Sequence, residues 1–174
     1  MHWDNQLLLF AAARRSATLD VFFRGITWLG SLYVLIPLAI LVVAILLYGQ
    51  RWREILLLVA GFGGAVLLAH LAKALLDRPR PTLAEPLVAM PADSSFPSAH
   101  TTQITAFALS LAFILYRTIP EWRFTAAALA AALAAALVAV VAVSRVYLQV
   151  HFPSDVLGGL ILGVVWVAMT HLLL

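Results

Sequence analysis

The sequence predicts an all-α integral membrane helical bundle with about five transmembrane helices plus an N-terminal interfacial helix. Hydrophobic residues make up 64% of the 174 residues and charged residues only 11%, whereas about a quarter of the residues of a soluble domain are charged. Apolar stretches of about 20 residues, long enough to cross the hydrocarbon core of a bilayer, recur along the chain. Because little sequence is left for a soluble module, we expect a single membrane domain over residues 1–174.

The N-terminal part of the chain predicts the interfacial helix and one span. Residues 5–13 are typical of a short helix lying at the membrane interface, with Trp3 beside it as an anchor. An apolar segment follows over residues 20–48, interrupted by an arginine, a glycine and a proline. We therefore expect an interfacial turn and then a true span that starts near Ser31.

Four further spans are predicted after a short polar turn at residues 50–54. We place them at residues 55–76, 98–119, 124–143 and 153–171. The span at 124–143 is rich in alanine, so we expect it to pack tightly inside the bundle, because small side chains let helices approach closely. A tight turn at residues 120–123 separates it from the preceding span.

Two loops carry nearly all the unusual polar residues of the chain. Residues 77–97 hold five prolines, which exclude a continuous helix, and residues 144–152 form a short polar loop. Since two spans lie between these loops, both emerge on the same side of the membrane. We therefore expect their polar side chains to converge.

Four cations gather at the membrane face where these loops emerge, with few carboxylates to neutralise them: Lys73, Arg78, Arg80 and Arg145. Ionisable residues next to a span are costly and are commonly functional. The guanidinium fork of arginine suits phosphate oxygens, and lysine adds a compact point charge. The alternative is that these side chains only extend to the lipid headgroups, but four cations on two convergent loops favour an anion-binding site.

Residues at the starts of two predicted helices suggest chemistry beside this anion site. Ser98 is a natural N-cap, and the free N–H groups of the following turn form a ready anion site. His100, in that turn, suits a proton donor to a leaving oxygen, because histidine titrates near neutrality. Asp155, four residues after His151, can bind one imidazole nitrogen and leave the other free as a nucleophile. The alternatives are structural: a plain helix cap, and a His–Asp pair that closes a helix end.

In order and spacing, these residues resemble the three-part signature of the type 2 phosphatidic acid phosphatase superfamily. The three motifs are read here as Lys73 to Arg80-Pro81, as Pro97-Ser98-Ala99-His100, and as Ser144, Arg145, His151 and Asp155. A single short motif is weak. Three motifs together, on loops that independently converge, are specific.

The resemblance implies a lipid phosphate phosphatase that works through a phosphohistidine. His151 would attack phosphorus with Asp155 orienting it, and His100 would protonate the leaving group and then activate water. The implied phosphate ligands are Lys73, Arg80, Ser98, Arg145 and the backbone N–H groups of Ala99 and His100. Because this cationic cradle would stabilise the charge of the transition state, we expect no cofactor and no metal.

Some positions depart from the family pattern or lie outside it. Ala99 stands where the second motif usually has glycine, which constrains how closely the backbone approaches the phosphate; we expect activity to survive. Asp77, Arg78 and Asp93 match no family position, so we give them no catalytic role. His70, inside the second span, reads as a satisfied interior histidine.

The expected partners are a lipid phosphate substrate and membrane lipids. Nucleic acid is not expected, because the basic residues lie between spans and form no long run. The resemblance implies undecaprenyl pyrophosphate, phosphatidylglycerol phosphate, phosphatidate or a lipid A phosphate as substrate, and the short loops favour a polyprenyl pyrophosphate or a glycerophospholipid phosphate. Positive charges divide evenly between the two sides once the presumed phosphate ligands are set aside, so only the resemblance places the site at the outer face of a bacterial inner membrane. The oligomeric state stays open.

Two other functions are compatible with parts of this pattern. A lipid phosphotransferase would use the same phosphohistidine and differ only in its acceptor. An ion-coupled transporter would also carry charges in the membrane, but transporter sites usually lie near the midplane on broken helices. The charges of this chain lie at the ends of spans on one side, which favours the enzyme.

Overall fold

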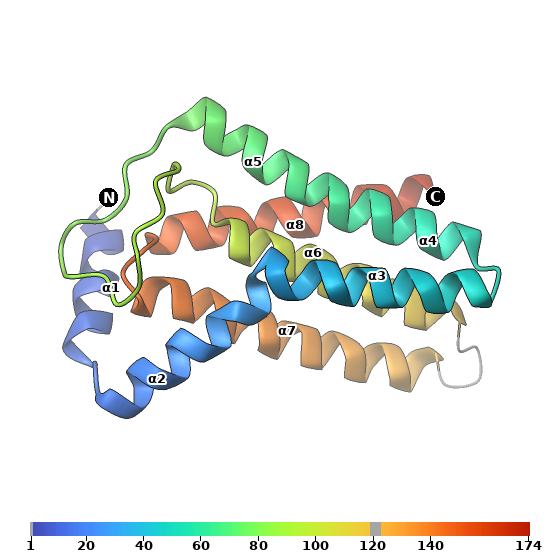
Figure 1. Ribbon diagram of the computed structural model, residues 1–174, viewed down its shortest axis with the longest axis horizontal. Helices are drawn as coiled ribbons and strands as arrows, with labels where there is room; N and C mark the ends of the chain where they lie inside the picture. The colour runs from blue at the N-terminus through green and yellow to red at the C-terminus, as the bar shows by residue number, and fades with distance from the viewer. Residues whose placement is uncertain (1, 119–122) are drawn as a thin grey trace.

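The computed structural model describes residues 2–118 and 123–174, in which α3 to α8 run side by side along one axis (Figure 1). Within these residues there are helices and no strands, which confirms the predicted all-α bundle. The α-helices are α1 (His2–Ala13), α2 (Ala17–Ile26), α3 (Leu32–Tyr48), α4 (Trp52–Leu58), α5 (Gly64–Leu76), α6 (Ala99–Thr118), α7 (Arg123–Tyr147) and α8 (Pro153–Leu173). A 3₁₀ turn, η1 (Thr27–Gly30), follows α2, and a π-helical turn, η2 (Val59–Gly63), joins α4 to α5.

The helices that can cross a membrane agree with the predicted spans. Four helical stretches are long and apolar enough: Trp52–Leu76, Ala99–Thr118, Phe124–Tyr147 and Pro153–Leu173. Residues Ala17–Gly30 and α3 together form a fifth candidate, a pair of helices that is long and apolar enough when taken together and is bent by 44° at the break. The bend lies at Ser31, which has an extended backbone and whose hydroxyl accepts a hydrogen bond from the Tyr33 N–H at 3.3 Å. The predicted count of about five is confirmed.

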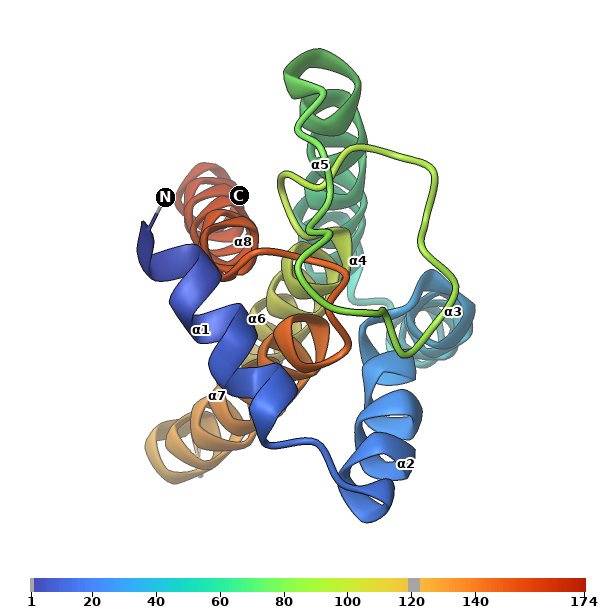
Figure 2. The same ribbon diagram turned by 90° about the vertical axis from the view of Figure 1, so that its left-hand side faces the viewer.

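α1 lies across one end of the bundle, against α7 and α8 (Figure 2). Its Leu8 is fully buried, and the Leu8 carbonyl accepts a hydrogen bond from Nε2 of Gln149 at 2.9 Å. Trp3 and Phe10 remain exposed on the outer side. α1 therefore runs across the spans and not along them, as expected for the interfacial helix predicted from the sequence.

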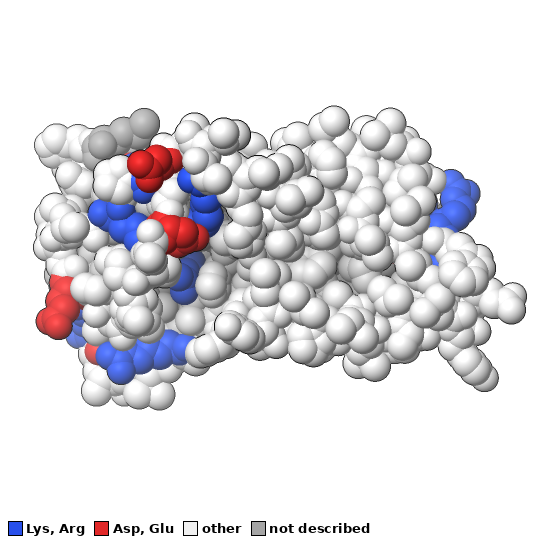
Figure 3. Space-filling view, turned by 45° about the horizontal axis from the view of Figure 1, so that its top comes forward, with Lys and Arg blue, Asp and Glu red and all other residues white. Residues whose placement is uncertain are grey.

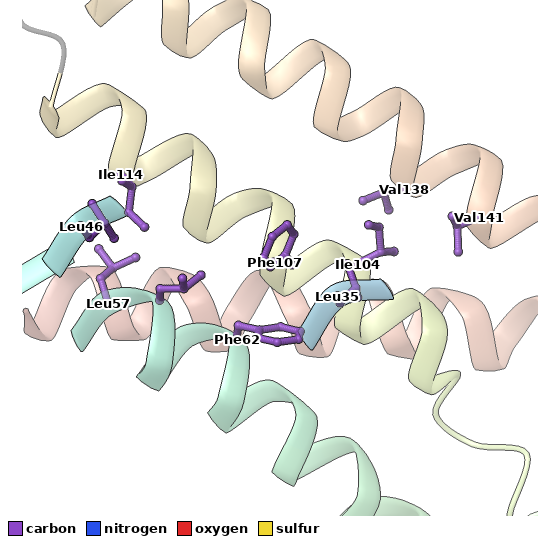
Figure 4. Packing of buried hydrophobic residues seen from close by; sticks show 10 residues of the cluster. Leu35, Leu46, Leu57, Phe62, Ile104, Phe107, Ile114, Val138 and Val141 are labelled. Atoms are coloured by element: carbon purple, nitrogen blue, oxygen red, sulfur yellow. The ribbon is translucent and has the colours of Figure 1, made fainter. Parts of the chain in front are cut away.

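α6 is the central helix and contacts α3, α4, α5, α7 and α8. Ile104 and Phe107 on its buried face pack into an apolar core with Phe62 and residues of α3 and α7 (Figure 4). Since lipid tails are as apolar as these side chains, close packing rather than transfer from water holds such helices together. At Gly159 of α8, an added Cβ would lie only 2.7 Å from the carbonyl oxygen of Ser98. This close approach fixes the start of α8 against the start of α6.

α7 departs from its prediction in two ways. Its span is the least buried, with 11% of its most apolar stretch buried against 50% for α6, so the expectation of an alanine-rich helix inside the bundle is wrong. α7 packs on α6 through one face, which includes Val138 and Val141. Its other face would meet lipid, where exposed alanine side chains carry no free-energy penalty because lipid tails are equally apolar. α7 also continues to Tyr147, so Ser144 and Arg145, predicted in a loop, belong to its last turn.

The remaining boundaries differ little from the predictions. α4 begins at Trp52, three residues before the predicted start of the second span, so the polar turn is shorter than expected. Residues 77–98 are not helical, as the prolines predict. The tight turn predicted at residues 120–123 lies largely outside the described residues.

Candidate active site

The two polar loops converge at one end of the bundle, as predicted from the parity of the spans. The N–H of Ser98 donates to the Asp155 carbonyl at 3.0 Å, and the N–H of Leu87 donates to the Leu148 carbonyl at 3.2 Å. Figure 3 shows Lys, Arg, Asp and Glu side chains gathered at this end, with no charged side chain on the middle of the visible face. The polar end and uncharged middle are the pattern of a membrane-spanning protein with its site at headgroup depth.

A cavity of about 220 Å³ opens at this end, and most of the predicted site residues line it. The predicted residues in its wall are Lys73, Arg80, Ala99, His100, Arg145 and His151. Ser98 and Asp155 are fully buried and do not line the cavity, but Ser98 directly precedes Ala99 in the chain and Asp155 lies next to His151. Three of the four predicted cations therefore face one cavity, together with both predicted catalytic histidines.

Lys73 and Arg80 share a carboxylate at the mouth of this cavity. Lys73, buried in the last turn of α5, ion-pairs with Asp93 at 3.1 Å and donates to the Ser94 carbonyl. Arg80 binds the other carboxylate oxygen of Asp93 at 2.6 Å. Burial raises the pKa of Asp93, but the hydrogen bonds from Arg80 and Lys73 outweigh it and hold that pKa below its ordinary value. Asp93 is therefore an anion bound by two of the predicted phosphate ligands.

Arg145 brings a further donor to the cavity from the last turn of α7. Its Nη1 donates to the Thr27 hydroxyl at 2.7 Å, which ties α7 to η1. The side chain is 4% exposed, and among the described residues its buried Nε has no hydrogen-bond partner. A buried guanidinium N–H without an acceptor is costly. A phosphate oxygen in the cavity would supply that acceptor.

His151 lies between this cationic cavity and Asp155. Its Nε2 is 3.3 Å from Nη1 of Arg80, and its Nδ1 is 3.6 Å from Oδ2 of Asp155. The latter separation is longer than a hydrogen bond, so the carboxylate faces this imidazole nitrogen without being bonded to it. Burial, opposed by Asp155 and reinforced by Arg145 and Arg80, lowers the pKa of His151 to about 4. The imidazole is thus neutral at pH 7, with a lone pair available for bonding.

Asp155 is held by three donors, which come from the loop before α6 and the loop before α8. The Ser95 hydroxyl and the Phe152 N–H donate to its Oδ2 at 2.5 and 2.8 Å. Arg78 donates to its Oδ1 at 2.5 Å. Asp155 occupies the first turn of α8, where an anion is favoured by the helix dipole. The carboxylate is consequently fixed in place beside His151.

The start of α6 presents its first turn to the same cavity. Ser98 directly precedes α6, and its hydroxyl accepts a hydrogen bond from the Thr101 hydroxyl at 3.1 Å. Ala99 is the first residue of α6 and its φ is not positive, so its backbone conformation suits an alanine as well as a glycine. The first N–H groups of a helix have no partner within it. Those of α6 lie next to His100 and are available to bind an anion.

Comparison with known proteins identifies the family. The sequence matches the family model of the PAP2 superfamily over residues 54–174. It is 33% identical to phosphatidylglycerophosphatase B of Bacillus subtilis over 161 residues, and this aligned region covers 92% of this chain and 77% of that protein. The chain belongs to the PAP2 superfamily. An undecaprenyl-diphosphatase of Sulfolobus acidocaldarius is 33% identical over 155 residues, covering 84% of this chain and 66% of that PAP2 relative.

Solved structures extend the likeness to nearly the whole chain. The crystal structure of a transmembrane PAP2-type phosphatidylglycerolphosphate phosphatase from Bacillus subtilis matches with a TM-score of 0.90 and 31% identity, covering 99% of this chain and 84% of that one. LpxE of Aquifex aeolicus matches with a TM-score of 0.74 and 26% identity, covering 95% and 93%. This PAP2 chain is accordingly an integral membrane lipid phosphatase, as the resemblance implied.

Two charged residues that the PAP2 signature omits contact predicted site residues. Asp93 binds Lys73 and Arg80, as described above. Arg78 was expected in the anion site, but it does not line the cavity and instead binds Asp155 from behind. The only signal in the sequence is that both are charged residues in the proline-rich loop, which does not reveal their partners.

Other residues around the PAP2 site were misjudged or missed. His70 is exposed rather than interior, although its Nδ1 is satisfied at 2.8 Å by the Val66 carbonyl. Asp4 of α1 was not predicted at all and is fully buried next to Arg78. The only signal in the sequence was a carboxylate in the polar first part of a helix whose later residues are apolar. Among the described residues, no group of three or more His, Asp or Glu side chains could hold a metal ion.

Proposed function

We propose that this chain hydrolyses a lipid phosphate or pyrophosphate through a phosphohistidine formed on His151. The observation that carries the proposal is the position of His151, whose Nε2 faces the cationic cavity while its Nδ1 faces Asp155. A neutral imidazole held from behind by a carboxylate is the arrangement of an activated nucleophile. The eight helices would act as one membrane phosphatase domain.

In the first step, the Nε2 lone pair of His151 attacks phosphorus and the bond from phosphorus to the leaving oxygen breaks. His100 donates a proton to that oxygen, so the leaving group departs as a neutral alcohol or a protonated phosphate. The positive charge that develops on the imidazole is stabilised by Asp155. In the second step, water attacks phosphorus, His100 accepts its proton, and the N–P bond breaks to release phosphate.

The cations and the start of α6 bind the phosphate in both steps. The proposed ligands are Lys73, Arg80, Ser98, Arg145 and the N–H groups of Ala99 and His100. Their role is to hold the three equatorial oxygens and to stabilise the charge that spreads over them. The unpaired Nε of Arg145 supports this assignment, because it is a buried donor without an acceptor among the described residues. We infer that the reaction needs no metal.

The substrate we propose is undecaprenyl pyrophosphate or a glycerophospholipid phosphate such as phosphatidylglycerol phosphate or phosphatidate. Relatives named for the first two substrates support this choice. The cavity lies at the end of the spans, where a lipid phosphate stands while its chains remain in the bilayer. By analogy with the family, we infer that this end faces the outside of a bacterial inner membrane.

Phosphate release from purified protein in detergent, measured with excess EDTA, tests the proposal. The panel contains undecaprenyl pyrophosphate, phosphatidylglycerol phosphate, phosphatidate and a lipid A, each with wild type, His151→Ala and His171→Ala. His171, at the far end of α8, provides a matched histidine control. We expect release from one lipid, retained in His171→Ala and abolished in His151→Ala. An acid-labile label on the protein after a short reaction with ³²P-labelled lipid would report the phosphohistidine directly.

Three results would contradict parts of the proposal. Substantial release by His151→Ala would exclude that residue as the nucleophile. Loss of activity in EDTA that magnesium restores would overturn the metal-free assignment. Phosphate that appears only on an added acceptor lipid would make the protein a phosphotransferase, which uses the same intermediate with a different acceptor.

A further inference from the structure

A network of buried charges lies behind Asp155, on the side away from the cavity. The guanidinium of Arg78 donates through Nη1 to Asp155 at 2.5 Å and to the Ser154 hydroxyl at 2.8 Å. Through Nη2 it donates to Asp4 at 3.2 Å. Both carboxylates are fully buried, whereas the Arg78 side chain is 27% exposed. One arginine therefore bridges two carboxylates that lie about 150 positions apart in the chain.

Asp4 binds the first turn of α8 as well as the arginine. Its Oδ1 accepts from the Ser154 N–H at 2.9 Å, and its Oδ2 accepts from the Ser154 hydroxyl at 2.7 Å. Ser154 is the second residue of α8, so its N–H has no partner within the helix. Asp4 thus caps α8 from α1, in the position where the helix dipole favours a negative charge.

We propose that Arg78, held by Asp4 of α1, is a positioning residue that fixes Asp155 behind His151. This inference rests on the proposed function, in which Asp155 orients the nucleophile. With Arg78 bound to Oδ1, the other oxygen, Oδ2, is the one that faces Nδ1 of His151. Rotation of the carboxylate would break the bonds to Arg78, Ser95 and the Phe152 N–H together.

The arginine is itself held on three sides, which makes it suitable as a support. Besides Asp4 and Asp155, its guanidinium carbon lies 4.5 Å from the centre of the Phe152 ring, within range of a cation–π contact. A buried carboxylate without a counterion is strongly destabilised, so Arg78 serves both carboxylates at once. Lysine could not replace it fully, because an ammonium lacks the planar fork that reaches two acceptors.

The consequence is that α1 contributes to the site although no signature residue lies on it. The matched family segment begins at residue 54, far beyond Asp4. The interfacial helix is connected to the nucleophile through Asp4, Arg78 and Asp155, each in contact with the next. We assign α1 the function of fixing the orientation of the His–Asp pair.

Steady-state kinetics on phosphatidylglycerol phosphate and undecaprenyl pyrophosphate in detergent micelles tests this assignment. The variants are Arg78→Ala, Arg78→Lys, Asp4→Asn, Asp155→Asn and the double variant Arg78→Ala/Asp155→Asn. Asp20→Asn is the matched control, since it changes the same charge in a carboxylate of α2 that binds the Tyr147 hydroxyl at 2.6 Å. Elution from a sizing column and thermal unfolding report whether each variant is folded.

We expect Arg78→Ala to lower kcat by about 10- to 100-fold, the loss seen when a partner that orients a metal-ligating side chain is removed, with KM changed less than about threefold. Arg78→Lys should recover part of this loss, Asp4→Asn should show a smaller loss, and Asp20→Asn should equal wild type. The decisive measurement is the double variant. If Arg78 acts through Asp155, Arg78→Ala has no further effect in the Asp155→Asn background.

Several outcomes would overturn the inference, and they are distinguishable from failure of the proposed function. Wild-type kcat in folded Arg78→Ala, additive losses in the double variant, or a rise in KM alone would each exclude a role through Asp155. A kcat loss that tracks loss of folded protein in all of Arg78→Ala, Arg78→Lys and Asp4→Asn would make the network purely structural. If wild type itself releases no phosphate, or Asp155→Asn is fully active, the proposed function fails and this inference fails with it.

Discussion

Two carboxylates, Asp155 and Asp93, border the cationic end of this phosphatase and differ in their burial and in the position of their partners. Asp155 is fully buried on α8 and is held by Arg78, Ser95 and the Phe152 N–H. The Asp93 side chain is 49% exposed, lies on the proline-rich loop, and binds two cations that face the cavity. One carboxylate lies behind the proposed nucleophile and the other at the mouth of the cavity.

The difference teaches how one cluster of cations can serve two purposes. Asp155, the counterion of Arg78, belongs to the framework of the site. The groups that donate hydrogen bonds to it come from the loops before α6 and α8, and they cannot move away from it without disrupting the site. Asp93 binds Lys73 and Arg80 through the same donors that a phosphate would need. Its carboxylate is half exposed, so solvent weakens these ion pairs relative to fully buried ones. We therefore expect the buried carboxylate to govern turnover and the exposed one to govern affinity.

The largest effect should come from Asp155→Asn. Asparagine keeps the size of the side chain but removes the charge that stabilises the imidazolium, and its amide favours the wrong tautomer of His151. By analogy with the equivalent change in a catalytic triad, kcat should fall by about 10³- to 10⁴-fold with little change in KM. Phosphate release under saturating lipid measures this. A loss no greater than that of Asp93→Asn would break the comparison.

A smaller effect should appear in the pH dependence of stability. The pKa of His151 is lowered to about 4 in the folded protein. The free energy of unfolding is therefore unaffected by this group above about pH 6.5, and it decreases as the pH falls from about 6.5 to about 4, where the unfolded chain binds the proton more readily. At about 1.4 kcal/mol per pKa unit, the stability lost is on the order of a few kcal/mol. The contribution of Asp93, whose pKa lies below its ordinary 3.8, is lost only at lower pH.

Thermal unfolding in detergent between pH 7 and pH 3 separates these two windows. His151→Gln should flatten the decline between about pH 6.5 and 4, because the group that titrates there is gone. Asp93→Asn should leave that decline unchanged and affect only the more acidic part. An unchanged profile in His151→Gln would show that another group causes the decline.

The smallest effect should come from Asp93→Asn on substrate affinity. Removing this carboxylate frees Lys73 and Arg80 for phosphate, so KM should fall by about two- to fivefold, the range expected from an exposed ion pair, while kcat stays similar. The inhibition constant of inorganic phosphate should fall in parallel. Asp77→Asn, which makes the same charge change just after α5, is the control and should leave both constants unchanged. A rise in KM would mean that Asp93 assists phosphate binding instead of competing with it.

Much of this architecture could be predicted from local features of the sequence. Hydropathy placed the spans, because crossing a bilayer requires about 20 apolar residues whatever their neighbours are. The five prolines of residues 77–97 excluded helix there by removing backbone donors. The parity of the spans put the two polar loops on one side, which is why Lys73, Arg80, His100 and His151 were expected together. Their roles in catalysis stay predictions.

Only the tertiary structure decided which charge contacts which. The alanine-rich α7 is mostly exposed on the outside of the bundle. In a membrane an apolar helix face gains little free energy by being buried, so the composition of α7 does not show whether it lies inside or outside the bundle. Arg78 binds Asp155 and not the cavity, and Asp4 of α1 completes the network from about 150 residues away. Contacts between such distant residues follow from how α1, α6 and α8 pack against one another. Hydropathy and motif spacing describe each segment alone and carry no information about that packing.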